Sequence, residues 1–223
     1  MATPYLQLRR YEVPSTQDLA RAEMERLPLV VICQRQSAGR GRGGAAWMTA
    51  PRALAASVAF KMGEDDDRPL SLIAGVAASR AIDGISLKWP NDLLVDHQKV
   101  GGILVERSGR LVVAGIGVNL WWPEAPDGMG ALWEEDPGPD WHARIGGLWA
   151  AEFLDLVTLE GWPVAAYRAA CETLGSPITW EPDGSGIAID VNERGELLVE
   201  RGGERHVINS GAIRHVRHGG GSD

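Results

Sequence analysis

The sequence predicts an α+β fold in which helices pack on a mixed or antiparallel central sheet, with a small β domain after it. Three observations support this fold class. Before residue 85, β-rich segments alternate with segments of helical period. From residue 85 to residue 118, strand segments separated by turn signals predict a meander. After residue 174, short alternating segments with Gly-containing turns predict a small antiparallel unit.

The composition of the 223 residues excludes several classes of protein. A formal net charge of −8 argues against non-specific binding to nucleic acid through overall charge. We find no apolar segment of transmembrane length and no signal peptide, so we expect a cytoplasmic protein. Cys33 and Cys171 do not suggest a disulfide framework, and Cys33 lies in an apolar segment that predicts a buried, reduced thiol.

The first elements are predicted to be a short strand over residues 5–13, a helix over residues 16–27 and a buried strand over residues 29–34. Ser15 is a suitable N-cap for the helix, with an acidic residue in the first turn. From spacing alone, this cap is the simplest interpretation of Ser15 and Thr16.

A glycine-rich loop follows over residues 36–47, in which four glycines alternate with Arg40 and Arg42. Glycine lets backbone amides approach an anion closely, and arginine adds charge with bidentate reach. The loop is therefore suited to folding over an anionic ligand. A flexible Arg-Gly segment, solvated or touching RNA, is the alternative, because the spacing matches neither a P-loop nor a dinucleotide-binding fingerprint.

The next elements are a strand over residues 54–60 and a helix over residues 69–83. Between them lies an acidic turn, residues 64–67. Consecutive aspartates are compatible with a metal site, but a solvated turn before a helix is the simpler interpretation.

Lysine is scarce, and its positions are informative. Only three of the 22 Lys and Arg residues are lysines, and Lys88 and Lys99 lie close together in the meander. A compact ammonium suits a point contact to a phosphate or a reacting carboxylate. Lys99 is predicted at the first turn of the meander with Gly101 and Gly102 behind it, which would bring backbone and ammonium close to a ligand.

After the meander we predict a loop over residues 121–140 and helices over residues 141–157 and 161–173. The composition changes at residue 174. The predicted domains are therefore residues 1–174, a small β domain over residues 175–218, and a disordered tail over residues 219–223.

Four sequence motifs together indicate a protein family. The chain resembles the biotin protein ligases, or biotin–[acetyl-CoA-carboxylase] ligases, in four motifs that occur in the family's order. These motifs are Ser15-Thr16-Gln17; Gln36 with Gly39-Arg40-Gly41-Arg42, Gly44 and Trp47; Lys88-Trp89-Pro90-Asn91-Asp92 with Lys99 and Gly102 to Glu106; and Gly115, Gly117, Val118 and Asn119. The resemblance implies a catalytic fold like that of class II aminoacyl-tRNA synthetases and a C-terminal barrel like an SH3 domain.

The resemblance also implies a two-step reaction. Biotin and Mg-ATP give biotinyl-5′-adenylate, and the biotinyl group then passes to a lysine of a biotin carboxyl carrier domain. The implied biotin contacts are Ser15, Thr16, Gln17, Gln36, Arg40, Gly41, Arg42, Lys99 and Gly102; the implied nucleotide contacts are Trp47, Lys88, Asn91 and Asn119. Lys99 and Arg42 would be the catalytic residues, because their positive charges would stabilise the negative charge that develops as the biotin carboxylate attacks the α-phosphate. No prosthetic group and no protein-held metal are expected, and homodimerisation through a sheet edge is implied by the family only.

The chain departs from the family pattern at Gln17, where the family has Asn, and at Gly43 and Ala45, where many members carry basic residues. These changes concern adenylate retention more than reaction class. The residues before Ser15 leave no room for a winged helix-turn-helix domain, so we expect no operator binding. A lipoate or octanoate ligase, a non-catalytic binding relative and an Arg-Gly RNA-binding protein remain as alternatives; the acidic charge disfavours the last.

Overall fold

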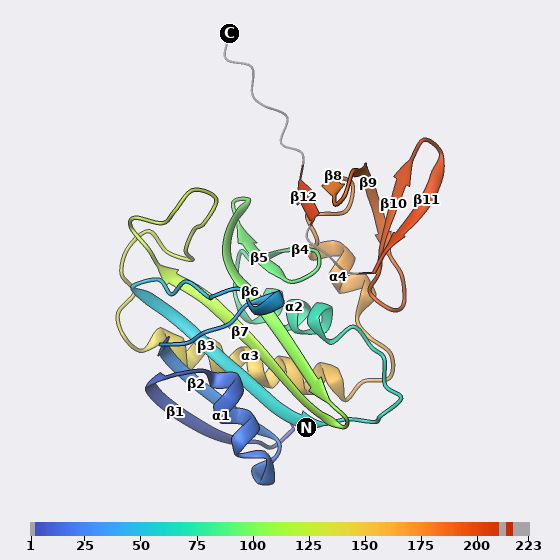
Figure 1. The fold of residues 1–223 in the computed structure, drawn as a ribbon. Helices are drawn as coiled ribbons and strands as arrows, with labels where there is room; N and C mark the ends of the chain where they lie inside the picture. Colours follow the sequence, from blue (N-terminus) through green and yellow to red (C-terminus); the bar gives the residue numbers. More distant parts are fainter. Residues whose placement is uncertain (1–2, 210–212, 216–223) are drawn as a thin grey trace.

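A seven-stranded mixed sheet forms the centre of the chain in a computed structural model, which describes residues 3–209 and 213–215 (Figure 1). The strand order is β1-β2-β3-β7-β6-β5-β4. β1 pairs with β2 in parallel, and the other neighbouring pairs are antiparallel. The strands are β1 Leu6–Val13, β2 Leu29–Gln36, β3 Arg52–Lys61, β4 Ser86–Lys88, β5 Asp92–Val95, β6 Gln98–Ser108 and β7 Leu111–Trp121. The predicted mixed sheet is confirmed.

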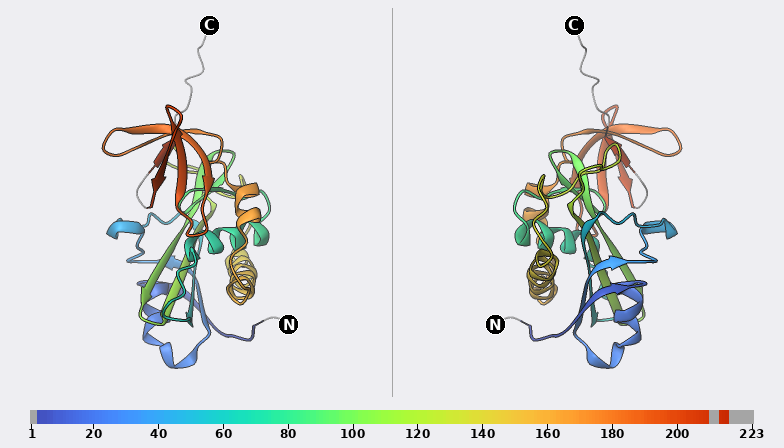
Figure 2. Two further views of the ribbon diagram at one scale, coloured as in Figure 1. Left: turned by 90° about the vertical axis from the view of Figure 1, so that its right-hand side faces the viewer. Right: turned by 90° about the vertical axis from the view of Figure 1, so that its left-hand side faces the viewer.

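Helices cover the two faces of this sheet unequally. α2 (Leu70–Ala81) and α3 (Trp141–Val157) lie on one face, and α1 (Thr16–Ala22) lies on the other (Figure 2). β2 shows how the sequence produces both layers: Val30 and Ile32 join the α2 and α3 core, whereas Leu29 and Val31 pack with the α1 side. This follows from the two-residue period of a strand.

The core under α2 and α3 is dense because α2 is narrow. An added Cβ at Gly75 would already lie 3.4 Å from the side chain of Leu87. Trp149 stacks on Phe153 with ring centroids 5.7 Å apart, and its indole donates to the Ala74 carbonyl at 3.1 Å. Each large side chain buried here stabilises the fold by roughly 1.5–3 kcal/mol. The face with α2 and α3 is therefore the structural side, which leaves the other face for a site.

A second, antiparallel sheet occupies the predicted C-terminal β unit. Its order is β11-β10-β9-β8-β12, and its strands are β8 Pro177–Trp180, β9 Gly184–Val191, β10 Leu197–Arg201, β11 Glu204–Ile208 and β12 Ile213–His215. Its apolar residues continue the main core. Two indoles hold the turn between β9 and β10 against the preceding part of the chain. Trp89, which follows β4, donates to the Gly195 carbonyl, and Trp162, which precedes α4, donates to the Glu193 carbonyl, both at 2.9 Å. The domain boundary at residue 174 stays a prediction, and the tail over residues 219–223 lies outside the described residues.

Three predicted helices are longer than the observed ones, and the helix predicted over 69–83 is α2, which spans Leu70–Ala81. The first ends at Ala22, where Glu23 leaves helical geometry, and a 3-10 turn, η1 (Met24–Arg26), follows. The helix predicted over 161–173 is α4 (Val164–Ala170), because Pro163 begins it and Cys171 is already extended. In the described ranges, 3–209 and 213–215, no helix is both long and apolar enough to cross a membrane.

We predict that Cys33 makes stability depend on pH in the alkaline range. Burial raises the pKa of this thiol from 9.0 to about 11. Because the folded-state pKa is the higher one, the contribution is complete below pH 9 and is lost as the pH rises towards 11. The free energy of unfolding in urea should fall by about 1–3 kcal/mol over this range. Cys33→Ala should remove that part of the slope; identical slopes in both proteins would contradict the assignment.

Candidate active site

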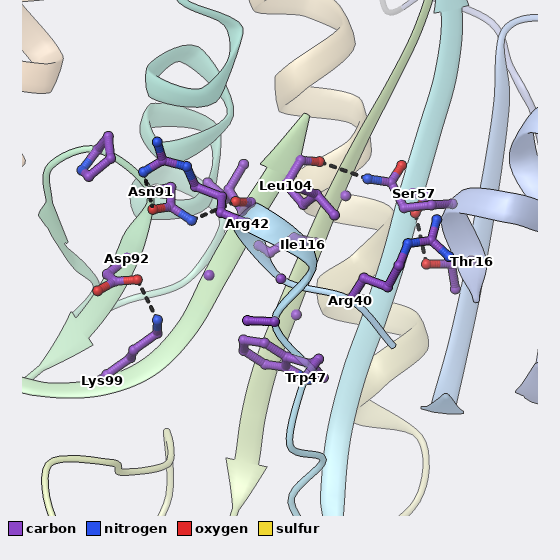
Figure 3. Close-up of a pocket in the computed structure, with 18 of the residues that line it drawn as sticks. Thr16, Arg40, Arg42, Trp47, Ser57, Asn91, Asp92, Lys99, Leu104 and Ile116 are labelled. Carbon is purple, nitrogen blue, oxygen red and sulfur yellow. Dashed lines mark hydrogen bonds and ion pairs between the residues drawn. The ribbon is translucent and has the colours of Figure 1, made fainter. Parts of the chain in front are cut away.

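A cavity of about 320 Å³ lies on the α1 side of the sheet (Figure 3). Its wall comes from the start of α1, the glycine-rich loop, β3, and the strands β4 to β7. The predicted site residues on this wall are Ser15, Thr16, Gln17, Gln36, Arg40, Gly41, Arg42, Trp47, Lys88, Asn91, Lys99 and Gly102. The structure therefore brings together segments that are far apart in the sequence.

The floor of the cavity is made of backbone. Gly115 and Gly117 on β7 face the cavity, and Gly117 pairs with Gly102 on β6. A Cβ added at Gly117 would lie 2.8 Å from the ring of Trp47, and one at Gly115 would lie 3.2 Å from the hydroxyl of Ser57. The glycines of the fourth motif thus provide space that side chains would fill.

One end of the cavity is a buried polar cluster at the start of α1. The amide and hydroxyl of Thr16 donate to Gln36 Oε1 at 2.7 and 3.0 Å, and the Ser57 hydroxyl donates to Thr16 Oγ1 at 2.8 Å. Ser15 caps the helix, with its Oγ accepting from the Asp18 amide at 3.3 Å. Ser15 therefore both caps α1 and lines the cavity.

Gln17 has a buried acceptor that faces no donor. Its Nε2 donates to the Leu104 carbonyl at 3.0 Å, while its Oε1 is buried without a hydrogen-bond partner among the described residues. Leaving a buried acceptor unpaired costs about 1–3 kcal/mol. Since other atoms of Gln17 line the cavity, rotation of its amide would turn this oxygen towards a ligand that brings its own N–H donors.

The glycine-rich loop forms a flap over the cavity, which we define as residues 39–47. Its ends pair through the Trp47 amide to the Gly39 carbonyl at 2.9 Å and the Gly41 amide to the Ala45 carbonyl at 2.7 Å. Its tip is a 3-10 turn, η2 (Arg42–Gly44), in which Gly43 and Gly44 have positive φ and nothing within 4 Å of an added Cβ. The tip is therefore open, while Trp47 is packed on the glycine floor.

The other end of the cavity is cationic (Figure 3). The ammonium of Lys99 lies 2.5 Å from Asp92 Oδ1, and Arg42 Nη1 donates to Asn91 Oδ1 at 3.4 Å. Asn91 is fixed by its own bond from Nδ2 to the Ile103 carbonyl at 2.8 Å. Lys99 and the flap thus line one cavity.

Asn119 does not line this cavity. It is fully buried, its Nδ2 donates to the Gly130 carbonyl at 2.9 Å, and its main-chain carbonyl accepts from the Leu132 amide at 3.0 Å, while its Oδ1 has no hydrogen-bond partner among the described residues. In this structure it fixes the loop after β7 to the sheet. A nucleotide contact for Asn119 stays a prediction.

Ser57, Asp92 and Ile213 are among the wall residues that were not predicted as site residues. Ser57 had a signal, because it is the polar residue inside the buried segment of β3. Asp92 belongs to a quoted motif, but its ion pair with Lys99 depends on the register of β5 and β6. Ile213 comes from the second sheet, and no local pattern places it on the cavity wall.

The comparisons with known proteins agree with this geometry. The biotin/lipoate A/B protein ligase family matches residues 11–120. A biotin–[acetyl-CoA-carboxylase] ligase of Mycobacterium tuberculosis is 32% identical, over 85% of this chain and 79% of that protein. One of Paracoccus denitrificans is 30% identical, over 82% and 88%. A solved biotin protein ligase from Aquifex aeolicus, in complex with biotin and ATP, has a TM-score of 0.81 at 23% identity, over 95% of this chain and 99% of that one.

The mixed sheet, the flap and the second sheet define the catalytic fold of the biotin protein ligases. Similarity to both ligases extends over most of this chain and most of each relative. The chain belongs to the family of biotin–[acetyl-CoA-carboxylase] ligases.

We predict that Gly117→Ala displaces Trp47 and loosens the flap. The new methyl group would overlap the indole, so the free energy of unfolding should fall by about 1–3 kcal/mol and amide exchange in residues 39–47 should become faster. Gly147→Ala is the matched control, because an added Cβ there meets nothing within 4 Å. Unchanged flap exchange in Gly117→Ala, measured by mass spectrometry, would show that Trp47 does not anchor the flap.

Proposed function

We propose that this chain joins biotin to ATP, forming biotinyl-5′-adenylate and pyrophosphate, and transfers the biotinyl group to a lysine of a biotin carboxyl carrier domain. The observation that carries the proposal is the two-ended cavity. One end offers buried hydrogen-bonding groups of Thr16, Gln17 and Ser57, and the other offers the cations of Lys99 and Arg42. Family membership and the names of the relatives support the same reaction.

The polar end suits the head group of biotin. A ureido ring presents two N–H donors and one carbonyl acceptor. Once the Gln17 amide rotates towards the cavity, its unpaired Oε1 accepts from one N–H, and the hydroxyls of Thr16 and Ser57 can reorient towards the carbonyl. Satisfying the buried Gln17 oxygen only when ligand is bound gives selectivity, because an analogue without the donor leaves it unpaired.

The cationic end suits the first chemical step. The biotin carboxylate attacks the α-phosphorus of Mg-ATP, a new oxygen–phosphorus bond forms, and the bond to the leaving pyrophosphate breaks. Two anions must approach each other, and positioned cations reduce this repulsion as charge develops. Lys99 and Arg42 line the cavity wall, and we assign both to the stabilisation of this charge. Lys88 lines the same wall, and we assign it to the nucleotide.

In the second step the amine of the carrier lysine attacks the acyl carbon, and AMP leaves with the electrons of the acyl–oxygen bond. The adenylate hydrolyses if water reaches it, so the cavity must close between the two steps. The flap is the segment suited to this task, because its open tip carries Arg42 over the cavity mouth.

We propose that the enzyme acts in the cytoplasm and without nucleic acid, consistent with the net charge of −8. The edge strand β1 exposes Leu6 and Tyr11, which supports homodimerisation through this edge.

The direct test uses radiolabelled biotin, Mg-ATP and a carrier domain, with each component omitted in turn. The proposal requires label on the carrier that depends on all three, and on one lysine. Binding of biotin without consumption of ATP would indicate a non-catalytic relative. Labelling by lipoate or octanoate in place of biotin would indicate the other branch of the superfamily.

We predict that Lys99→Ala abolishes adenylate formation, with biotin-dependent pyrophosphate exchange reduced by at least about 10²-fold. The physical reason is the loss of the ammonium beside the reacting carboxylate and phosphate. Lys61→Ala is the matched control, because Lys61 ends β3 at an exposed position outside the cavity wall. Exchange at the wild-type rate in Lys99→Ala would refute the role.

We predict that Arg42→Gly releases the adenylate faster. The variant removes the cation from the flap tip and leaves four consecutive glycines over positions 41–44, so closure costs more conformational entropy. Release of labelled biotinyl-5′-adenylate, measured by rapid filtration, should accelerate by about 10-fold or more. If the variant retains adenylate as long as the wild type does, Arg42 does not hold it.

A further inference from the structure

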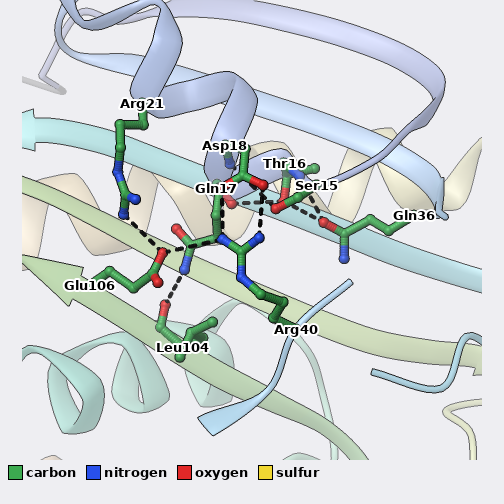
Figure 4. A network of polar contacts seen from close by, with 10 residues as sticks. Ser15, Thr16, Gln17, Asp18, Arg21, Gln36, Arg40, Leu104 and Glu106 are labelled. Carbon is green, nitrogen blue, oxygen red and sulfur yellow. Dashed lines mark hydrogen bonds and ion pairs between the residues drawn. The ribbon is translucent and has the colours of Figure 1, made fainter. Parts of the chain in front are cut away.

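A cluster of four charged side chains connects the flap to α1 and β6 (Figure 4). Arg40 Nη1 and Nη2 donate to the two carboxylate oxygens of Asp18, both at 2.7 Å. Arg40 Nη2 also lies 3.8 Å from Glu106 Oε2, and Arg21 Nη2 donates to that same oxygen at 2.9 Å. Two carboxylates and two guanidinium groups thus form one balanced network beside the cavity.

The two arginines of the flap have different environments. Both guanidinium Nη atoms of Arg40 are engaged by Asp18 in a bidentate pair, the strong and directional form of this interaction. Among residues 3–209 and 213–215, Arg42 has one long contact to a neutral amide, at 3.4 Å. Arg42 is thus available to a ligand, whereas Arg40 is already committed to the protein. The hydrogen bond from Arg40 also lowers the pKa of the Asp18 carboxyl, which keeps it ionised.

The flap needs such an attachment because its own composition opposes order. Glycines at its tip lose more conformational freedom on ordering than other residues do. Trp47 fixes one end of the flap on the glycine floor. The Arg40–Asp18 pair lies at the other end and joins the flap to the helix whose first residues line the polar end of the cavity.

We propose that Asp18 is a positioning residue that holds the flap over the cavity through Arg40, so that Arg40 serves as a strut and Arg42 is the flap cation that meets the ligand. The effect of this ion pair on adenylate retention rests on the proposed function, whereas its role in holding the flap does not. Glu106 assists by holding Arg40 and Arg21 in one network.

The first test measures the flap without any ligand. Trypsin cleaves after Arg42, and the rate of this cleavage, followed by mass spectrometry, reports how often the flap opens. Asp18→Asn should accelerate the cleavage by about 2- to 5-fold, as expected for an exposed ion pair. The matched control is Asp190→Asn, which breaks a similar bidentate pair between Asp190 of β9 and Arg168 of α4 and should leave cleavage after Arg42 unchanged.

A double-mutant cycle separates the strut from an effect of Asp18 on α1 itself. Arg40→Gln leaves α1 intact and should accelerate cleavage after Arg42 as much as Asp18→Asn does. In the Arg40→Gln protein, adding Asp18→Asn should have no further effect. Additive effects, or cleavage at the wild-type rate in both single variants, would overturn the proposal.

Adenylate retention supplies the second readout. Asp18→Asn should release biotinyl-5′-adenylate about 2- to 5-fold faster, with the KM for biotin changed less than the release rate. If the chain forms no adenylate at all, the proposed function fails, but the double-mutant cycle read out by trypsin still tests whether Asp18 and Arg40 hold the flap. If adenylate forms and its release does not respond to Asp18→Asn, the strut has no role in retention and this part of the proposal is wrong.

Discussion

The site depends on a strip of sheet that carries no side chains. Gly102, Gly115 and Gly117 let the ring of Trp47 and the side chain of Gln17 lie directly on the strands β6 and β7. One methyl group at Gly117 would overlap that ring. The opposite face of the same strands carries Ile103, Ile116 and their neighbours into the α2 and α3 core. The period of two residues along a strand therefore separates stability from function within single strands.

Two parts of the chain fix the walls around this floor. At the polar end, the first residues of α1 are buried and bonded to Gln36 and Ser57, so the helix start is rigid before ligand arrives. At the cationic end, the indole of Trp89 is held by Gly195 and its amide donates to Thr173 at 3.0 Å. The second sheet thus sets the position of the segment from Lys88 to Asp92. Such preorganisation reduces the cost of ordering the site during catalysis.

Much of the fold and site could be predicted from the sequence because the signals were local. The spacing of apolar residues distinguished strands from helices. Twelve of the predicted site residues line the cavity, and they could be named in advance because they belong to recognisable motifs. The ion pairs of Arg40 with Asp18 and of Lys99 with Asp92 could not be predicted, since they depend on how the flap docks and on the register of β5 and β6. Helix ends such as Ala22 also depended on local geometry that propensity does not specify. Asn119 belongs to a motif but lies off the cavity wall, where its Nδ2 binds the loop after β7, so its nucleotide contact stays a prediction.

The most direct measurement is a crystal structure of the protein with a non-hydrolysable analogue of biotinyl-5′-adenylate. The account predicts the head group within hydrogen-bond distance of Thr16 and Gln17, and the phosphate analogue about 3 Å from Lys99 Nζ beneath the flap. An analogue bound outside this cavity, or one whose phosphate mimic lies away from Lys99 with the flap uninvolved, would contradict it.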